Sequence, residues 1–154
     1  MPRPIVCALV ALLVLVVAAC GGADAEPTDA EYARAVVTAV DRTDYALARA
    51  TSAKSRDELV KRLSEAGVVI SAAGNELDEH GAPSVFSDEN ERLVKALETL
   101  GNDVASTAEQ LQQPGSEGLL TGARGLSFDS WDQANLALGS LIGSGLPVKT
   151  LQRH

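Results

Sequence analysis

Cysteine and histidine are scarce in this chain: there are two of each among 154 residues. Two cysteines are too few for a small domain stapled by disulfides, and they do not have the CxxC spacing. A structural zinc site normally takes four Cys or His ligands. We therefore expect neither a disulfide-stapled domain nor a zinc protein, and we expect no metal or cofactor.

Aromatic residues and positive charge are scarce as well. Aromatics make up 3% of the chain, and 21 acidic residues outnumber 13 basic ones, for a net charge of −8. A protein that binds nucleic acid electrostatically carries a basic patch, so we expect no nucleic-acid partner. The length is that of one domain, which typically spans ~100–200 residues.

A hydrophobic run is present, but it is short. It covers the 15 apolar or small residues Ile5–Ala19. A membrane-spanning helix needs ~20 such residues, whereas the hydrophobic core of a secretory signal has ~7–15. Arg3 and the terminal amine supply the basic start, and Gly21 and Gly22 interrupt any helix that would continue. Residues 1–19 are therefore predicted to be an export signal.

The end of this run, VAAC at residues 17–20, resembles the lipobox of bacterial lipoproteins. The resemblance implies that the Cys20 thiol receives a diacylglyceryl group and that the signal peptide is cleaved just before it. The protein would then be held on the extracytoplasmic face of the cell membrane, because each buried CH₂ contributes ~0.8 kcal/mol and several acyl chains anchor stably. The alternative is an ordinary secretory signal, since ADA at residues 23–25 also fits a signal-peptidase site.

Residues 20–28 form the predicted tether between lipid and domain. After Cys20 they are small, polar and acidic, as in a flexible linker. Cleavage would remove Cys7 and Arg3, leaving one thiol, no intramolecular disulfide and a charge of 12 − 21 = −9.

The remaining sequence has the pattern of α-helices. Apolar residues recur at steps of three and four in four segments, 29–50, 55–80, 88–112 and 130–142. Each segment thus has one apolar face for packing. We predict an all-α, up-and-down four-helix bundle over residues 29–143, followed by a C-terminal tail, 144–154. The predicted core positions are Ala33, Val36, Val40, Thr43, Leu47, Ala50, Leu59, Leu63, Ala66, Ile70, Ala73, Leu77, Leu93, Leu97, Leu100, Val104, Thr107, Leu111, Trp131, Ala134, Leu138 and Leu141.

Capping signals mark the helix starts. Three capping boxes are predicted, Thr28 with Glu31, Ser55 with Glu58 and Ser130 with Gln133. A fourth start is predicted at Ser87, with acidic residues directly after it.

Glycines at 67, 74 and 101 fall inside predicted helices, where each costs up to ~1 kcal/mol relative to alanine. We expect them to allow close approach of neighbouring helices. The alternative is a hinge or kink that admits a ligand.

No catalytic constellation stands out. His154 is the last residue of the sequence, and His80 closes a predicted helix, where a cation offsets the helix dipole. Glu76 and His80 are too few to hold a metal, and Leu77 breaks the Glu-x-x-His pattern of di-iron carboxylate bundles. Nucleophile-elbow, phosphate-loop and zinc-protease motifs are missing. We therefore expect no catalytic, cofactor-binding or metal-binding residues, and no enzyme.

Charge is unevenly distributed along the chain. Residues 76–91 contain six acidic side chains and no Lys or Arg, whereas five basic residues in 49–62 outnumber Asp57 and Glu58. In an up-and-down bundle these turns lie at opposite ends, with the acidic end next to the anchor. The hypothesis is a bipolar bundle whose basic end faces outward. One alternative is that these charged side chains are scattered over the surface and merely solvated. Another is a weak divalent-cation site in the acidic turn.

Residues 113–129 are long for a connection in a helical bundle, where ~2–8 residues are usual. The connection nevertheless carries apolar side chains, and with the tryptophan that follows they form a possible partner-binding patch: Leu119, Leu120, Leu126, Phe128 and Trp131. The alternative is that these residues cover the open side of the bundle.

Three functions are compatible with the sequence. The favoured one is a lipoprotein that binds another envelope protein through a helical surface, without enzymatic activity. The second is a carrier of a small apolar ligand or lipid, although such pockets are typically lined by aromatics. The third is an envelope hydrolase, although the sequence contains no motif of such an enzyme.

Overall fold

The structure is a computed structural model that describes residues 26–115 and 128–153. In this part of the chain it consists of four α-helices: α1 (Asp29–Thr51), α2 (Arg56–His80), α3 (Ser87–Gln112) and α5 (Asp129–Gly143). A single 3₁₀ turn, η1 (Ser84–Phe86), precedes α3. The predicted all-α four-helix bundle is confirmed, and each helix begins and ends within one residue of its predicted bounds.

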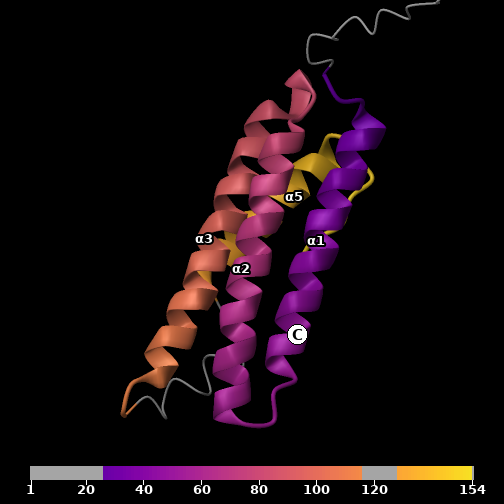
Figure 1. Ribbon diagram of the computed structural model, residues 1–154. Helices are drawn as coiled ribbons and strands as arrows, with labels where there is room; N and C mark the ends of the chain where they lie inside the picture. Colours follow the sequence, from indigo (N-terminus) through magenta and orange to yellow (C-terminus); the bar gives the residue numbers. More distant parts are fainter. Residues whose placement is uncertain (1–25, 116–127, 154) are drawn as a thin grey trace, which may run out of the picture.

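The helices run alternately up and down (Figure 1). α2 and α3 share the most extensive contact, α1 packs on α2, and the shorter α5 packs on α3. The start of α1 and the turn between α2 and α3 lie at one end of the bundle, where the backbone N–H of Ser84 donates a hydrogen bond to Glu26. The chain therefore enters the bundle beside the α2–α3 turn.

The core follows the predicted apolar stripes. Of the predicted core positions, only Thr107 is half-buried, and the neighbouring Ala108 takes its place in the core. Each fully buried Leu or Ile contributes ~1.5–3 kcal/mol through its removal from water. The largest fully buried side chains are Tyr32, Leu47, Leu59, Leu63, Ile70, Leu77, Leu93, Leu97, Leu100, Leu111, Leu138 and Leu141.

The predicted helix caps are confirmed in part. At α1 the capping box is complete, since the Thr28 hydroxyl accepts from the Glu31 N–H and the Glu31 carboxylate accepts from the Thr28 N–H. At α2 the box is half formed. Ser55 accepts from the Glu58 N–H, but the Glu58 carboxylate accepts from the N–H of Lys54 instead of that of Ser55.

The two other predicted starts are wrong in detail. α5 begins at Asp129, and buried Ser130 donates its hydroxyl proton to Asp103 of α3 at 2.6 Å instead of capping its own helix. α3 begins at Ser87 itself, because the 3₁₀ turn before it makes Phe86 the N-cap residue.

The helix-interior glycines sit where α2 and α3 approach each other closely. A Cβ added to Gly67 would lie 2.8 Å from the carbonyl oxygen of Gly101 and 2.9 Å from the Cβ of Ala105. A Cβ on Gly74 would lie 3.3 Å from the Cβ of Leu97. The expected close approach of helices is confirmed.

Residues 144–153 were predicted as a tail, but they pack against the bundle. Leu146 and Leu151 belong to the core, with 3% and 4% of their surface exposed. Within the described residues, no helix has both the length and the apolar composition needed to cross a membrane.

Candidate functional site

The groove between α3 and α5 has the features of a docking surface. It encloses about 400 Å³, and its floor is formed by the small side chains of Ala96 and Ala137. Leu136 lies at its edge with 72% of its surface exposed. The small side chains of these alanines leave space between the two helices.

Two basic residues of α3, Arg92 and Lys95, complete this groove. In the part of the chain that the structure describes, neither side chain forms an ion pair or hydrogen bond. Most other basic side chains there are paired with a carboxylate, as in Arg62 with Glu58 at 2.5 Å. The groove thus combines the exposed side chain of Leu136 with two basic side chains, Arg92 and Lys95, that form no ion pair with a described carboxylate.

A second groove, of about 490 Å³, lies between α1 and α2 near the end where the chain enters. Its floor is also built of alanines, but its charges are largely paired. Arg42 forms an ion pair with Glu76, and Arg34 donates from Nε to the carbonyl of Ala30 at 3.1 Å. This leaves fewer free groups for a ligand than in the α3–α5 groove.

Glu31 borders the same groove. Hydrogen bonds from the backbone N–H and the hydroxyl of Thr28, at 2.9 and 2.7 Å, hold the pKa of the Glu31 carboxyl below its usual value. The carboxyl is therefore ionised at neutral pH and occupied with capping α1.

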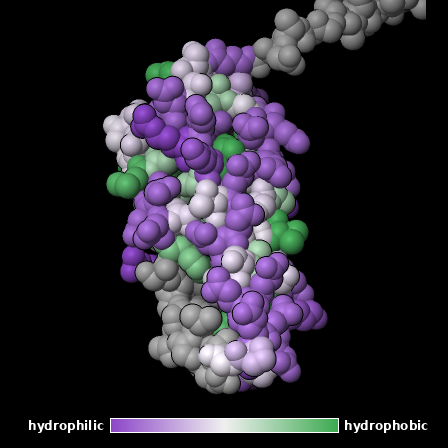
Figure 2. Space-filling model, turned by 90° about the vertical axis from the view of Figure 1, so that its left-hand side faces the viewer, coloured by the Kyte–Doolittle hydropathy of each residue, from purple (hydrophilic) through white to green (hydrophobic). Residues whose placement is uncertain are grey.

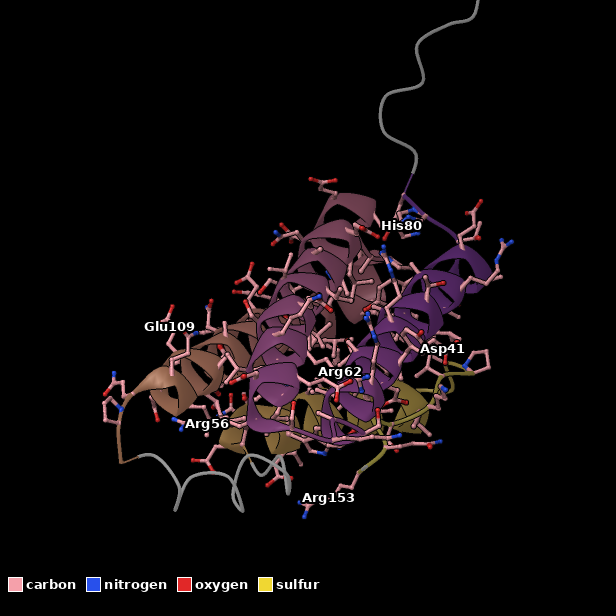
Figure 3. The ribbon with its side chains drawn as sticks, turned by 60° about the horizontal axis from the view of Figure 1, so that its bottom comes forward. Asp41, Arg56, Arg62, His80, Glu109 and Arg153 are labelled. Atoms are coloured by element: carbon pink, nitrogen blue, oxygen red, sulfur yellow. The ribbon has the colours of Figure 1, made fainter. Side chains whose placement is uncertain are left out.

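His80 is the last residue of α2, as predicted, and lies at one end of the bundle (Figure 3). Glu76, one turn earlier, is held by Arg42. Among the described residues, no three His, Cys, Asp or Glu side chains gather as they would to hold a metal ion. The acidic residues of the α2–α3 turn are thus spread out, not convergent.

The acidic end of the bundle, residues 26–34 and 76–92, carries nearly all of the net charge. It has nine acidic and two basic residues, 2 − 9 = −7, out of 11 − 19 = −8 for all described residues. At the opposite end, the described residues 49–65 and 103–113 contain five basic and five acidic residues, so their charges balance. This count of described residues does not favour the hypothesis of a basic outer end, because Glu65, Asp103 and Glu109 also lie there.

Arg56 illustrates how a basic residue of the neutral end is used. Its guanidinium donates to the carbonyls of Leu111 and Gln113, at 2.9 and 3.0 Å, and so caps the last turn of α3. In Figure 3 Arg56 and Arg62 lie at the end of the bundle opposite His80.

The predicted partner patch is only partly within the described residues. Leu119, Leu120 and Leu126 lie outside them, as does Cys20. Trp131 is buried in the core with 3% of its surface exposed, and Phe128 is half-buried against the same core. These two side chains therefore pack on the bundle. Figure 2 shows hydrophobic residues on the α3 side as separate spots among hydrophilic ones.

The residues that line the α3–α5 groove were not singled out from the sequence. One signal was available, since Leu136 lies off the apolar stripe of α5 on a helix face that would otherwise be polar. Comparison with known proteins adds nothing to this picture: no protein family, curated protein or solved structure matches the chain.

Proposed function

We propose that this chain is an extracytoplasmic lipoprotein, anchored through a diacylglyceryl group on Cys20, whose helical bundle binds a protein partner of the cell envelope without catalysing a reaction. The sequence at residues 17–20 supports the anchor. The observation that carries the binding role is the α3–α5 groove, in which Leu136 is exposed beside Arg92 and Lys95, whose side chains have no partner among the described residues.

The shape of the groove favours a protein partner over a small apolar ligand. Sites for small ligands bury most of the ligand in a concave, mainly apolar pocket. Here the groove is open along the side of the bundle, and the basic residues Arg92 and Lys95 stand beside its mainly apolar surface. Such a surface suits a helix or loop that covers Leu136 and brings carboxylates to the two cations.

The charge distribution is consistent with a domain that stands off the membrane. Glu26 follows Cys20 by six residues, and an extended chain covers ~3.3–3.6 Å per residue. The acidic end would thus face the membrane at a distance of at most ~20 Å. Repulsion from anionic headgroups acts over a Debye length of ~8 Å. The α3–α5 groove, on the side of the bundle, would then be free to meet a partner.

Site-specific photo-crosslinking in intact cells tests the binding role. A photoreactive amino acid at Leu136 is compared with the same residue at Val68 of α2, which is equally exposed at 70%. We expect a discrete protein adduct from position 136 only, and we expect Arg92→Glu with Lys95→Glu to reduce its yield. Equal adducts from both positions, or an adduct indifferent to charge reversal, would refute the binding role of this groove.

A further inference from the structure

The C-terminal segment, residues 147–153, is bound to the bundle as an extended peptide. α5 ends in a Schellman-type turn, with Gly145 at φ +91° and the N–H of Leu146 bonded to the carbonyl of Leu141 at 3.0 Å. The chain then turns back and runs without helical structure beside α1 (Figure 1). The segment contacts both helices, through Asn135 of α5 and Asp44 of α1, and the two helices make few direct contacts with each other. We call the space that it fills between them the α1–α5 cleft.

Side chains of the two helices bind the backbone of this segment. Asn135 of α5 accepts from the N–H of Leu151 at 2.8 Å and donates to its carbonyl at 3.5 Å. Asp44 of α1 accepts from the N–H of Gln152 at 2.9 Å. Contacts to the main chain do not depend on the identity of the bound residues, and this is how many proteins hold an extended peptide of variable sequence.

Side-chain contacts define which peptides would fit. Leu151 is 4% exposed and fills the apolar part of the cleft. Lys149 pairs with Asp41 of α1 at 2.5 Å, and Arg153 pairs with Asp132 of α5 at 3.4 Å. Figure 3 shows Asp41 beside the yellow C-terminal segment, which leads to Arg153. The cleft therefore fits a peptide that has an apolar residue in the middle, a basic residue two positions before it and a second basic residue two positions after it.

We infer that the α1–α5 cleft is a peptide-binding site, which the chain's own C-terminal segment fills in cis and from which an extended peptide of a partner protein, with the pattern basic-x-apolar-x-basic, can displace it. Within residues 147–153 only Leu151 belongs to the core, with Val148 packed against it, and the ion pairs of Lys149 and Arg153 lie at the surface, whereas the helices are held by the continuous core. We therefore expect the bundle to stay folded when this segment is released. This site is independent of the α3–α5 groove and of the lipid on Cys20.

Competition between the bound segment and an added peptide tests the inference. The protein is residues 20–154 with Cys20→Ser, and the probe is a synthetic peptide of residues 145–153 carrying a fluorophore. A segment tethered by a short linker has an effective concentration in the mM range. We expect the peptide to bind the Leu151→Asp chain about tenfold or more tightly than the unmodified chain, because the altered segment no longer fills the cleft.

A matched pair of variants checks that the peptide occupies this cleft. In the Leu151→Asp background, Asn135→Ala should weaken peptide binding several-fold. Gln133→Ala, on the α3-facing side of the same helix, should leave it unchanged. Absence of binding to a folded Leu151→Asp chain, or equal effects of the two alanines, would overturn the inference. So would a concentration-dependent dimer that exchanges its segments, because the occupant would then be a second copy of the chain.

Hydrogen exchange on the unmodified chain keeps the inference testable if Leu151→Asp unfolds. The Leu151 and Gln152 amides should exchange at least tenfold faster than those of Ile70 and its neighbours in α2, through local release of the segment. If the segment and α2 amides share one exchange free energy, the segment opens only when the bundle unfolds and the inference fails.

Discussion

Gly67→Ala tests the close packing of α2 on α3. On helix propensity alone, the substitution should stabilise the bundle by ~1 kcal/mol, because alanine is the best helix former and glycine a poor one. The structure predicts the opposite sign. The added Cβ would lie 2.8 Å from the carbonyl oxygen of Gly101 and 2.9 Å from the Cβ of Ala105. Both neighbours are fixed to helix backbones, so α2 and α3 must separate.

The size of the effect follows from two opposing contributions. Forcing an extra methyl group into a well-packed core costs typically ~1–3 kcal/mol, and the propensity gain of ~1 kcal/mol offsets part of it. We expect a net loss of up to ~2 kcal/mol. With a urea m-value of ~2 kcal/mol/M, central for small domains, the unfolding midpoint falls by up to about 1 M.

Gly139→Ala is the matched control. Gly139 also lies inside a helix, α5, but a Cβ there meets no atom within 4 Å. This variant should gain up to ~1 kcal/mol from propensity alone. Urea unfolding followed by circular dichroism at 222 nm compares both variants with the parent chain. If Gly67→Ala is stabilised as much as Gly139→Ala, the close contact between α2 and α3 is refuted.

Three further predictions concern buried polar groups and a capping carboxylate. Thr43→Val should raise the free energy of unfolding by ~1 kcal/mol, because the buried Thr43 hydroxyl makes no hydrogen bond within the described residues; a loss in a thermal melt would show that the hydroxyl has a partner. Tyr32→Phe should cost ~1–2 kcal/mol in urea unfolding, because it leaves the Asn90 side chain without the 3.1 Å hydrogen bond from the buried tyrosine; no change would contradict this. The lowered pKa of Glu31 means that its contribution to stability is present above its unfolded pKa of ~4.3 and lost as the pH falls through the lower folded pKa. The stability difference between Glu31→Gln and the parent should therefore be largest near pH 7 and vanish in acid, and a pH-independent difference would refute the assignment.

The fold was largely predictable from the sequence because its determinants are local. Apolar residues at steps of three and four fixed the buried faces, and capping residues such as Thr28 fixed the ends. Gly81, with φ +72°, ends α2 where the sequence places a stop. Local sequence signals fail to predict a helix cap where a residue distant in the sequence forms a hydrogen bond with the capping side chain. Ser130 looks like an N-cap, but Asp103 of α3 provides a charged acceptor for its hydroxyl.

Surfaces were predicted less well, because they combine residues from several helices. The α1–α2 turn is basic in sequence, but Glu65, Asp103 and Glu109 balance its charge among the described residues 49–65 and 103–113. The segment 147–153 has no periodicity, so its binding to Asn135 and Asp44 could not be read from its own sequence. The α3–α5 groove likewise depends on which faces of two helices meet.

Lipidation of Cys20 is the central claim about where this domain works, and one measurement tests it directly. The chain and its Cys20→Ser variant are expressed in a bacterium that processes lipoproteins, and the intact mass and membrane fraction of each product are determined. Cys7→Ser, within the predicted signal peptide, serves as the matched control. We expect the parent and Cys7→Ser products to begin at Cys20, to carry the mass of a diacylglyceryl group and to sediment with membranes, and the Cys20→Ser product to lose all three properties. A Cys20→Ser product with the same processing, mass and membrane association as the parent would contradict the account.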